Sequence, residues 1–314
     1  MKETLKLSFE MTDTLSRIEH NGLKINLDTL DKIEKEYEDE MIALESKLNE
    51  LAKKAMGDTP INLASPDDKS VLLYSRKVRD KNLWSLTFNL GHEMRGNTIK
   101  PKMRPRMKHT DFVRHVRRMT DIVYKTIGNQ CKDCGGTGRV RLPRKDGSLG
   151  KAKRICKTCM GKGVVYTSTG EVAGFKLIPR TVRDTASAGF KTDKTTLEDR
   201  LSELDGDARE FCSAYSRYNA LRTYLSTFVE GMKNNVDDNN FIHPEFMQCV
   251  TATGRLSSRN PNFQNMPRGS TFAIRKVVES RFDGGFILEG DYSQLEFRVA
   301  GFLAKDSQVY QDVL

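Results

Sequence analysis

The sequence lacks any run of about eighteen consecutive apolar residues, the length that a membrane-spanning helix requires. The N-terminal stretch MKETLKLSFE also lacks the apolar segment of a secretory signal peptide. Hydrophobic residues make up 37% of the 314 residues, and charged residues make up 30%. These absences exclude a protein built on transmembrane helices, and they predict a cytoplasmic protein with no membrane partner.

Acidic residues are scarce in two stretches of a chain whose net charge is +10. Between Glu93 and Arg118 there are nine Lys/Arg against two acids, and between Arg139 and Lys162 there are nine against Asp146 alone. Two solvated basic surfaces are one interpretation. Contact with the phosphates of a nucleic acid is the interpretation that the local concentration of charge favours.

Disulfides are not expected from the six cysteines of a basic, cytoplasmic chain. Four of them form two copies of the pattern C-x-x-C-x-G-x-G, which is typical of zinc knuckles. The four are Cys131, Cys134, Cys156 and Cys159. Four thiolates close a tetrahedral Zn²⁺ site without an open position, so we expect a structural metal. Cys212 and Cys249 lie in apolar sequence, and we expect both thiols to be buried.

Between the knuckles lies RVRLPRKDGSLGKAKRI, a basic hairpin with a turn predicted at Asp146-Gly147. Three interpretations stay open at the level of sequence. The hairpin contacts nucleic-acid phosphates, it docks a protein partner, or its charge only keeps it soluble.

Helical periodicity is clear on both sides of this region. Asp28 is a candidate N-cap for a long amphipathic helix that ends near Met56-Gly57, and Ser65-Pro66 has the form of a second helix start. Periodicity is lost between Arg79 and Asp184, and returns at Leu197. We therefore expect a helical element that is split by an inserted basic module.

Near the C-terminus, Gly285–Asp291 has the pattern of an apolar strand, followed at once by a helix. The Asp291 carboxylate and the Tyr292 carbonyl oxygen suit a hard divalent cation, although a strand-end aspartate is often only a helix cap. Two-metal phosphoryl transfer needs at least one further carboxylate.

Upstream of this strand, TATGRLSSRNPNFQNMP is dense in amide and hydroxyl side chains. Such groups can bind sugar, phosphate and the minor-groove acceptors that base pairs share. A polar loop without a ligand is the alternative interpretation.

These two stretches resemble family A DNA polymerases, the bacterial DNA polymerase I-like group. TATGRLSSRNPNFQNMP is similar to the segment ahead of the palm, and DYSQLEFR is similar to motif A. The stretch YNALRTYLSTF resembles the second long thumb helix, and residues 8–75 resemble the start of the polymerase domain. The resemblance covers roughly two thirds of the chain and leaves out the basic module.

The resemblance implies a role for each matching residue. Asp291 would be one of two aspartates that bind catalytic Mg²⁺, with the carbonyl of Tyr292, and Glu296 would lie under the incoming sugar and exclude a 2′-hydroxyl. Arg255 would reach the minor groove at the primer terminus, and Arg298 would be structural. Primer-template contacts would come from Ser226, Thr227, Asn262, Gln264 and Asn265.

The predicted fold class is α+β: a helical thumb with an inserted four-cysteine zinc module, then part of an antiparallel palm sheet. The predicted segments are residues 1–78, the start of the polymerase domain with the first thumb helices, and 79–190, the basic insertion. Residues 191–240 would complete the thumb, and residues 241–314 would form a partial palm.

The resemblance also implies what is missing. The fingers helix and the second catalytic aspartate of the family do not occur in this sequence, nor does a proofreading exonuclease. We therefore expect the N-terminal piece of a split polymerase. Such a protein would be encoded by a phage and would act in the host cytoplasm. Its expected partners are primer-template DNA and a C-terminal polymerase chain. A separate exonuclease or processivity factor is a further candidate partner. The alternatives are a non-catalytic DNA-binding or regulatory protein descended from a polymerase, and part of a longer single chain.

Overall fold

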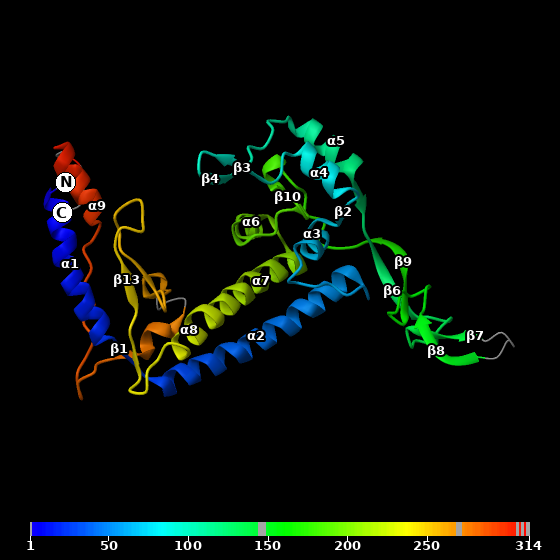
Figure 1. Ribbon diagram of the computed structural model, residues 1–314. Helices are drawn as coiled ribbons and strands as arrows, with labels where there is room; N and C mark the ends of the chain where they lie inside the picture. Colours follow the sequence, from blue (N-terminus) through cyan, green and yellow to red (C-terminus); the bar gives the residue numbers. More distant parts are fainter. Residues whose placement is uncertain (1, 144–148, 268–271, 306–307, 309–310, 312–314) are drawn as a thin grey trace. The chain divides into compact units, whose positions relative to one another are not determined.

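The computed structural model describes residues 2–143, 149–267, 272–305, 308 and 311. Contacts between residues divide the chain into two compact units. The central unit is residues 37–223, and the terminal unit combines residues 1–36 with 224–314. Figure 1 follows the elements along the chain from the blue N-terminus to the red C-terminus. Within the described ranges, no helix has both the length and the apolar character needed to cross a bilayer.

Two long helices, α2 (Leu27–Met56) and α7 (Gly206–Tyr224), pair antiparallel within the central unit. Ion pairs link them at successive levels: Glu40 accepts two hydrogen bonds from Arg217, at 2.7 and 2.8 Å. Further along, Lys47 meets Glu210 at 2.6 Å, and Lys54 meets an aspartate of α7 at the same distance. The long helix expected from periodicity is therefore confirmed, and its partner is the helix predicted after Leu197.

The core of the central unit also includes the region between residues 79 and 190. Trp84 is fully buried, with its ring 4.6 Å from the ring of Phe88 and 5.4 Å from that of Phe190. These aromatic residues share one cluster with Leu48 of α2 and Phe211 of α7. The basic region is thus anchored to the helix pair by buried aromatic side chains. Burial of each large apolar side chain stabilises the fold by about 1.5–3 kcal/mol.

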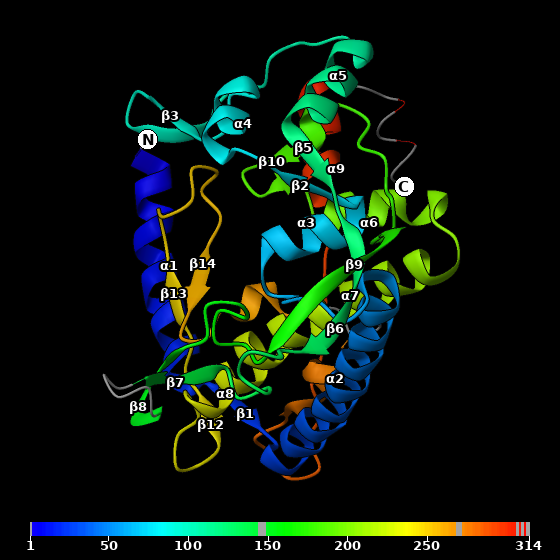
Figure 2. The ribbon, with the colours of Figure 1, turned by 90° about the vertical axis from the view of Figure 1, so that its right-hand side faces the viewer.

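Short helices and two-stranded antiparallel pairs build the rest of the central unit. The helices are α3 (Pro66–Tyr74), α4 (Lys81–Thr87), α5 (His109–Met119) and α6 (Lys194–Arg200). The strand pairs are β2 (Arg76–Val78) with β5 (Thr120–Ile122), β3 (His92–Arg95) with β4 (Thr98–Pro101), β6 (Tyr124–Gln130) with β9 (Val164–Val172), β7 (Arg139–Pro143) with β8 (Leu149–Ile155), and β10 (Thr185–Ala186) with β11 (Gly189–Phe190). Figure 2 shows β6 and β9 as the long strands of one ribbon.

Helix starts in the central unit follow the sequence signals. The Ser65 side chain accepts a hydrogen bond from the Asp68 N–H, as predicted, and Asp80 caps α4 in the same way. Helix α5 was missed, because its apolar positions are interrupted by five basic side chains or histidines. Its Phe112, among others, is buried.

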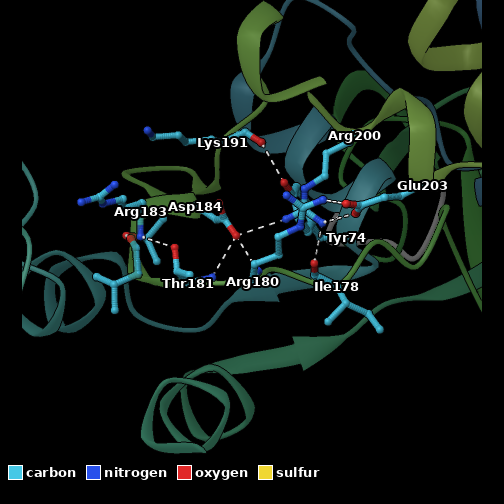
Figure 3. Close-up of polar contacts among 11 residues, drawn as sticks. Tyr74, Ile178, Arg180, Thr181, Arg183, Asp184, Lys191, Arg200 and Glu203 are labelled. Carbon is cyan, nitrogen blue, oxygen red and sulfur yellow. Dashed lines mark hydrogen bonds and ion pairs between the residues drawn. The ribbon is translucent and has the colours of Figure 1, made fainter. Parts of the chain in front are cut away.

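A buried arginine connects α6 to the turn before β10 (Figure 3). The Arg200 side chain is only 7% exposed, and it donates to the Ile178 carbonyl at 2.9 Å and to the Asp184 carboxylate at 3.2 Å. The same carboxylate accepts the backbone N–H of Thr181 at 3.0 Å. These partners compensate the burial of the Arg200 charge, and all of them belong to the central unit.

In the terminal unit, α1 (Lys2–Asn21) ends at the turn residues Asn21-Gly22, where Gly22 has φ +62°. Strand β1 (Leu23–Ile25) then lies between β12 (Phe241–Ile242) and β15 (Val278–Glu279) in an antiparallel sheet. A second pair, β13 (Glu245–Met247) with β14 (Ser257–Arg259), lies beside α1 in Figures 1 and 2. Helices α8 (Glu230–Lys233) and α9 (Leu295–Ala304) complete the unit.

Three local predictions were tested by this structure. The side chain of Asn26, not that of Asp28, accepts the N–H of Thr29 at 2.8 Å and caps α2, because Asn26 is the residue before the first helical turn. Asp28 lies inside that turn, where a carboxylate still favours the helix dipole. Cys212 is fully buried, as expected, but Cys249 is exposed.

The α+β fold class is confirmed at the level of mixed helices and small antiparallel sheets. The four sequence segments remain a prediction. The turn predicted at Asp146-Gly147 lies outside the described residues.

Candidate metal centre and nucleic-acid site

The four predicted zinc ligands converge at the end of the β6–β9 ribbon. All four sulfur atoms lie within 4.8 Å of one another, and the cluster is almost entirely buried. Cys131 Sγ is 3.8 Å from Cys156 Sγ, and Cys134 Sγ is 3.7 Å from Cys159 Sγ. A tetrahedral zinc with Zn–S bonds of about 2.3 Å places its sulfurs about 3.8 Å apart. The donor set therefore fits a closed structural Zn²⁺ site.

The two knuckles hold their sulfurs in the same way. Gly138 N–H donates to Cys134 Sγ at 3.3 Å, and Gly163 N–H donates to Cys159 Sγ at 3.2 Å. Such bonds stabilise the thiolate form that a metal requires. Both glycines have positive φ, +71° and +76°.

Each knuckle also packs against the other through these glycines. A Cβ on Gly138 would lie 2.2 Å from the Gly161 carbonyl oxygen, and a Cβ on Gly163 would lie 2.2 Å from that of Gly136. Cys131 N–H donates to the Gly163 carbonyl at 2.8 Å. In the other knuckle, Cys156 N–H donates to the Gly138 carbonyl at 2.9 Å. The repeated glycines of the motif are thus explained by backbone contact between the two copies.

Thiol acidity differs across the cluster. Backbone N–H groups of Cys159 and Thr158 lower the pKa of the Cys156 thiol to about 7, whereas burial raises the pKa of Cys131 to about 11. The two sulfurs also share a hydrogen bond. Because a metal binds cysteine as the thiolate, metal binding to this cluster releases the protons of its thiols.

The amide-rich loop of the terminal unit is organised around one buried hydroxyl. Ser258, in β14, is 4% exposed. Its Oγ donates to Asn262 Oδ1 at 3.1 Å and accepts the Gln264 N–H at 3.4 Å. The loop is held from beneath, and the side chains of Asn262, Gln264 and Asn265 are exposed. This arrangement presents amide groups outward, as binding to a ligand requires.

Arg255 and Glu296 come together although 41 residues separate them in the chain. The Arg255 guanidinium donates to the Glu296 carboxylate, and both side chains are mostly exposed. The Thr251 hydroxyl donates to the Arg255 carbonyl at 2.7 Å and closes the loop behind the guanidinium. The ion pair joins the amide-rich loop to α9, so the two segments singled out in the sequence form one surface.

Ser226 and Thr227 lie in a π-helical stretch, Leu225–Val229, between α7 and α8. Both are exposed. Single π turns within an α-helix are rare and are frequent at functional sites. Beyond it, Gly231 approaches the ring of Pro261, which brings α8 next to the amide-rich loop.

Asp291 and Tyr292 are exposed in irregular backbone, because the strand expected over Gly285–Asp291 does not form. The helix expected after it does form, as α9. Phe286 and Leu288 are 78% and 85% exposed. In the described part of the chain no strand pairs with this stretch, and an isolated strand leaves its backbone groups without a ladder.

Sequence reasoning missed Arg275, which ties the end of the loop to this stretch. Its guanidinium contacts the Glu289 carboxylate at 2.9 Å and the Pro267 carbonyl at 3.2 Å. No spacing rule connects Arg275 with a glutamate 14 residues later, so only the fold reveals the contact. Arg298, expected to be structural, donates to the carbonyl of Ser293 at 2.8 Å and makes no other hydrogen bond from its side chain within the described ranges.

Comparison with known proteins gives a consistent family. Residues 168–313 match the model of DNA polymerase family A. The DNA polymerase of Bacillus phage SP01 is 31% identical over 168 residues, which are 51% of this chain and 18% of that protein. DNA polymerase I of Synechocystis is 36% identical over 126 residues, which are 39% of this chain and 12% of that protein. DNA polymerase I of Treponema pallidum is 41% identical over 120 residues, 38% and 11% of the two chains.

Among solved structures, the POL domain of Pol1 from M. smegmatis, in complex with DNA primer-template and dNTP, matches with a TM-score of 0.46 and 18% identity. That match covers 96% of this chain and 34% of the other. The chain spans less than a fifth of the curated relatives described above. The family match includes the π turn, the amide-rich loop and Asp291, and it begins after the cysteine cluster.

Proposed function

We propose that this chain supplies the thumb and part of the palm of a family A DNA-directed DNA polymerase. The observation that carries the proposal is the family match over residues 168–313, which contains every primer-template contact that the family resemblance implies. The joining of the amide-rich loop to α9 by Arg255 and Glu296 supports it, because the resemblance assigns Arg255 to the minor groove at the primer terminus and Glu296 to the incoming sugar.

Primer-template binding is assigned to the exposed side chains of the terminal unit. The amides of the loop bind sugar and minor-groove acceptors, and Arg255 donates to the same groove, which gives grip without sequence preference. Glu296 holds the guanidinium in place and lies where it limits the space for a 2′-hydroxyl. The hydroxyls of Ser226 and Thr227 bind phosphate.

Asp291 is assigned as one of two metal-binding carboxylates, with the Tyr292 carbonyl beside it. Within the described ranges, the one group of three or more ligand side chains that could hold a metal is the cysteine cluster. The residues around Asp291 therefore do not complete a Mg²⁺ site by themselves, since two-metal chemistry requires a further carboxylate. We assign that carboxylate, and the fingers, to polypeptide outside these 314 residues, in the form of a complementing chain.

The exposed apolar surface around Asp291 supports this assignment. Large apolar side chains between residues 282 and 303 are between 47% and 85% exposed. They are Phe282, Phe286, Ile287, Leu288, Tyr292, Leu295, Phe297, Val299, Phe302 and Leu303. So many large exposed apolar side chains in one stretch of a folded protein are typical of an interface. Added palm strands would pair with residues 285–291 and cover it.

Complementation of primer extension tests the proposal. The chain is mixed with candidate C-terminal fragments, primer-template, Mg²⁺ and nucleotides, and extension is compared between the wild type, Asp291→Asn and Asp283→Asn. Asp283 is an exposed aspartate in the same irregular stretch, so its variant controls for the loss of one charge. Asp291→Asn should lower the extension rate by on the order of 10³-fold or more, the scale of losing a group that acts in the transition state. The control should retain activity, and both variants should bind primer-template as the wild type does.

Extension that survives Asp291→Asn would remove the catalytic role of this residue. Binding of primer-template without extension, with every fragment tried, would favour a polymerase-derived protein that binds DNA and does not catalyse.

A further inference from the structure

The β7–β8 arm carries its positive charge in an arrangement that is unfavourable in the free protein. In this antiparallel pair Arg141 lies directly opposite Lys153, and Arg139 lies two residues from Arg141 on the same face. Like charges directly opposite each other in a ladder repel. Lys151 and Arg154 add two more exposed cations to the arm.

Among the described residues, none of these five side chains makes an ion pair. Two acids lie near the arm in the sequence. Asp133 accepts a hydrogen bond from the Thr158 hydroxyl, and Asp146 lies outside the described residues. The neighbouring β6–β9 ribbon shows the ordinary arrangement, since Lys125 there contacts Glu171 at 2.7 Å.

The base of the arm is held by the cysteine cluster. Cys156 N–H donates to the Gly138 carbonyl at 2.9 Å, which joins the start of β7 to the end of β8. On the opposite face from Arg141, Val140 packs against the cluster. The cationic face is therefore presented on a ribbon whose base a closed metal site would make rigid.

We infer that the face of the β7–β8 arm formed by Arg139, Arg141 and Lys153 binds the phosphodiester backbone of a nucleic acid. Two residues of a strand advance by about 6.8 Å, which equals the rise of two phosphates of one strand along the axis of a duplex, at about 3.4 Å each. A two-stranded ribbon also has the width that the major groove admits. A bound polyanion relieves the repulsion between the opposed cations of the ladder. A protein surface that carries charges of both signs would relieve only part of this repulsion. The inference rests on the proposed function, because it adds a second contact to the same DNA.

The test is the salt dependence of DNA binding by the full chain. The arm variant is Arg139→Gln with Arg141→Gln and Lys153→Gln. The control variant is Lys32→Gln with Lys35→Gln and Lys53→Gln, three exposed lysines of α2, so that both variants lose the same net charge. Anisotropy of labelled primer-template gives the association constant between 50 and 200 mM salt, and bound zinc per chain shows whether the module is intact.

Each phosphate contact contributes about 0.9 to the slope of log K against log salt for a duplex and about 0.7 for a single strand. The slope for the arm variant should therefore be less negative than that of the wild type by about 2.7 on the duplex, or by about 2.1 on the template strand alone. The control should change the slope by less than one contact. Zinc content should equal that of the wild type in both variants.

Wild-type binding with an unchanged slope in the arm variant on both probes overturns the inference and leaves the proposed function standing. An equal loss of slope in the arm and control variants also overturns it, because net charge alone then explains the effect. A wild-type chain that binds neither probe overturns both proposals.

Discussion

Gly138 offers a sharp test of the metal centre, because a single methyl group there meets the other knuckle. The variant Gly138→Ala places a Cβ 2.2 Å from the Gly161 carbonyl oxygen, at a position with φ +71°. Backbone must move to relieve this contact, and the bond from Gly138 N–H to Cys134 Sγ is then lost. Gly135→Ala is the matched control: its φ is +57°, and no atom lies within 4 Å of the added Cβ.

The magnitudes follow from these two differences. A left-handed backbone costs a residue with a Cβ about 1–2 kcal/mol, and this cost is common to both variants. A hydrogen bond to a charged acceptor is worth about 1.5–3 kcal/mol, and this loss is confined to Gly138→Ala. Because metal binding is coupled to folding of the module, these costs lower zinc affinity. At 1.4 kcal/mol per factor of ten, we expect about 5- to 30-fold weaker binding for Gly135→Ala and about 60- to 4,000-fold for Gly138→Ala.

Competition for Zn²⁺ with a chromophoric chelator measures both affinities in the full chain. Emission of Trp84, which is fully buried in the same unit, reports whether the remainder stays folded. The reasoning fails if Gly138→Ala binds zinc as tightly as Gly135→Ala while both proteins are folded, or if the wild type binds no zinc.

Three further outcomes are expected. Hydrogen bonds from Arg217 lower the pKa of Glu40, so the pair stabilises the fold above the unfolded carboxyl pKa of about 4.3 and loses this effect as pH falls through the lower folded pKa. The difference in unfolding free energy between wild type and Glu40→Gln should therefore be at most about 1 kcal/mol at pH 7 and should shrink at pH 3. Arg200→Met leaves the half-buried carboxylate of Asp184 without its cation. Chemical denaturation should show a free energy of unfolding that is lower by about 3–5 kcal/mol. Burial raises the pKa of Cys212 to about 12, so in the zinc-loaded protein a thiol reagent at pH 8 should modify Cys249 quickly and Cys212 only on unfolding.

The cysteine cluster could be predicted from the sequence because its geometry is local. Each C-x-x-C turn places two sulfurs by itself, and the glycines that follow are required by the contact between Gly138 and Gly161. Only the approach of one knuckle to the other needs the β6–β9 ribbon, and two matching motifs imply that approach. The long helices were predictable for a similar reason, since periodicity of apolar residues reports a face over many turns.

Contacts between distant residues could not be predicted in this way. Whether a cysteine is buried depends on what packs against it. The apolar neighbours of Cys249 in the sequence therefore led to the wrong prediction that this thiol is buried. The same holds for Arg200, whose burial depends on a carboxylate and a carbonyl from the turn before β10. The anchoring of Trp84 beneath α2 and α7 likewise follows from tertiary packing and not from the loss of periodicity around it.

The stretch from Gly285 to Asp291 shows a different limit. Its alternating apolar pattern describes what the segment does when a neighbouring strand pairs with it, and the described part of the chain offers no such neighbour. The segment is therefore irregular, while α9, whose hydrogen bonds are internal, forms where it was expected. A helix can be read from its own residues, but a strand is a property of two segments. If added polypeptide restores the ladder, amide exchange at residues 286–290 should slow on complementation, and the carboxylate of Asp291 should become fixed at the end of a strand, as its proposed role in metal binding requires.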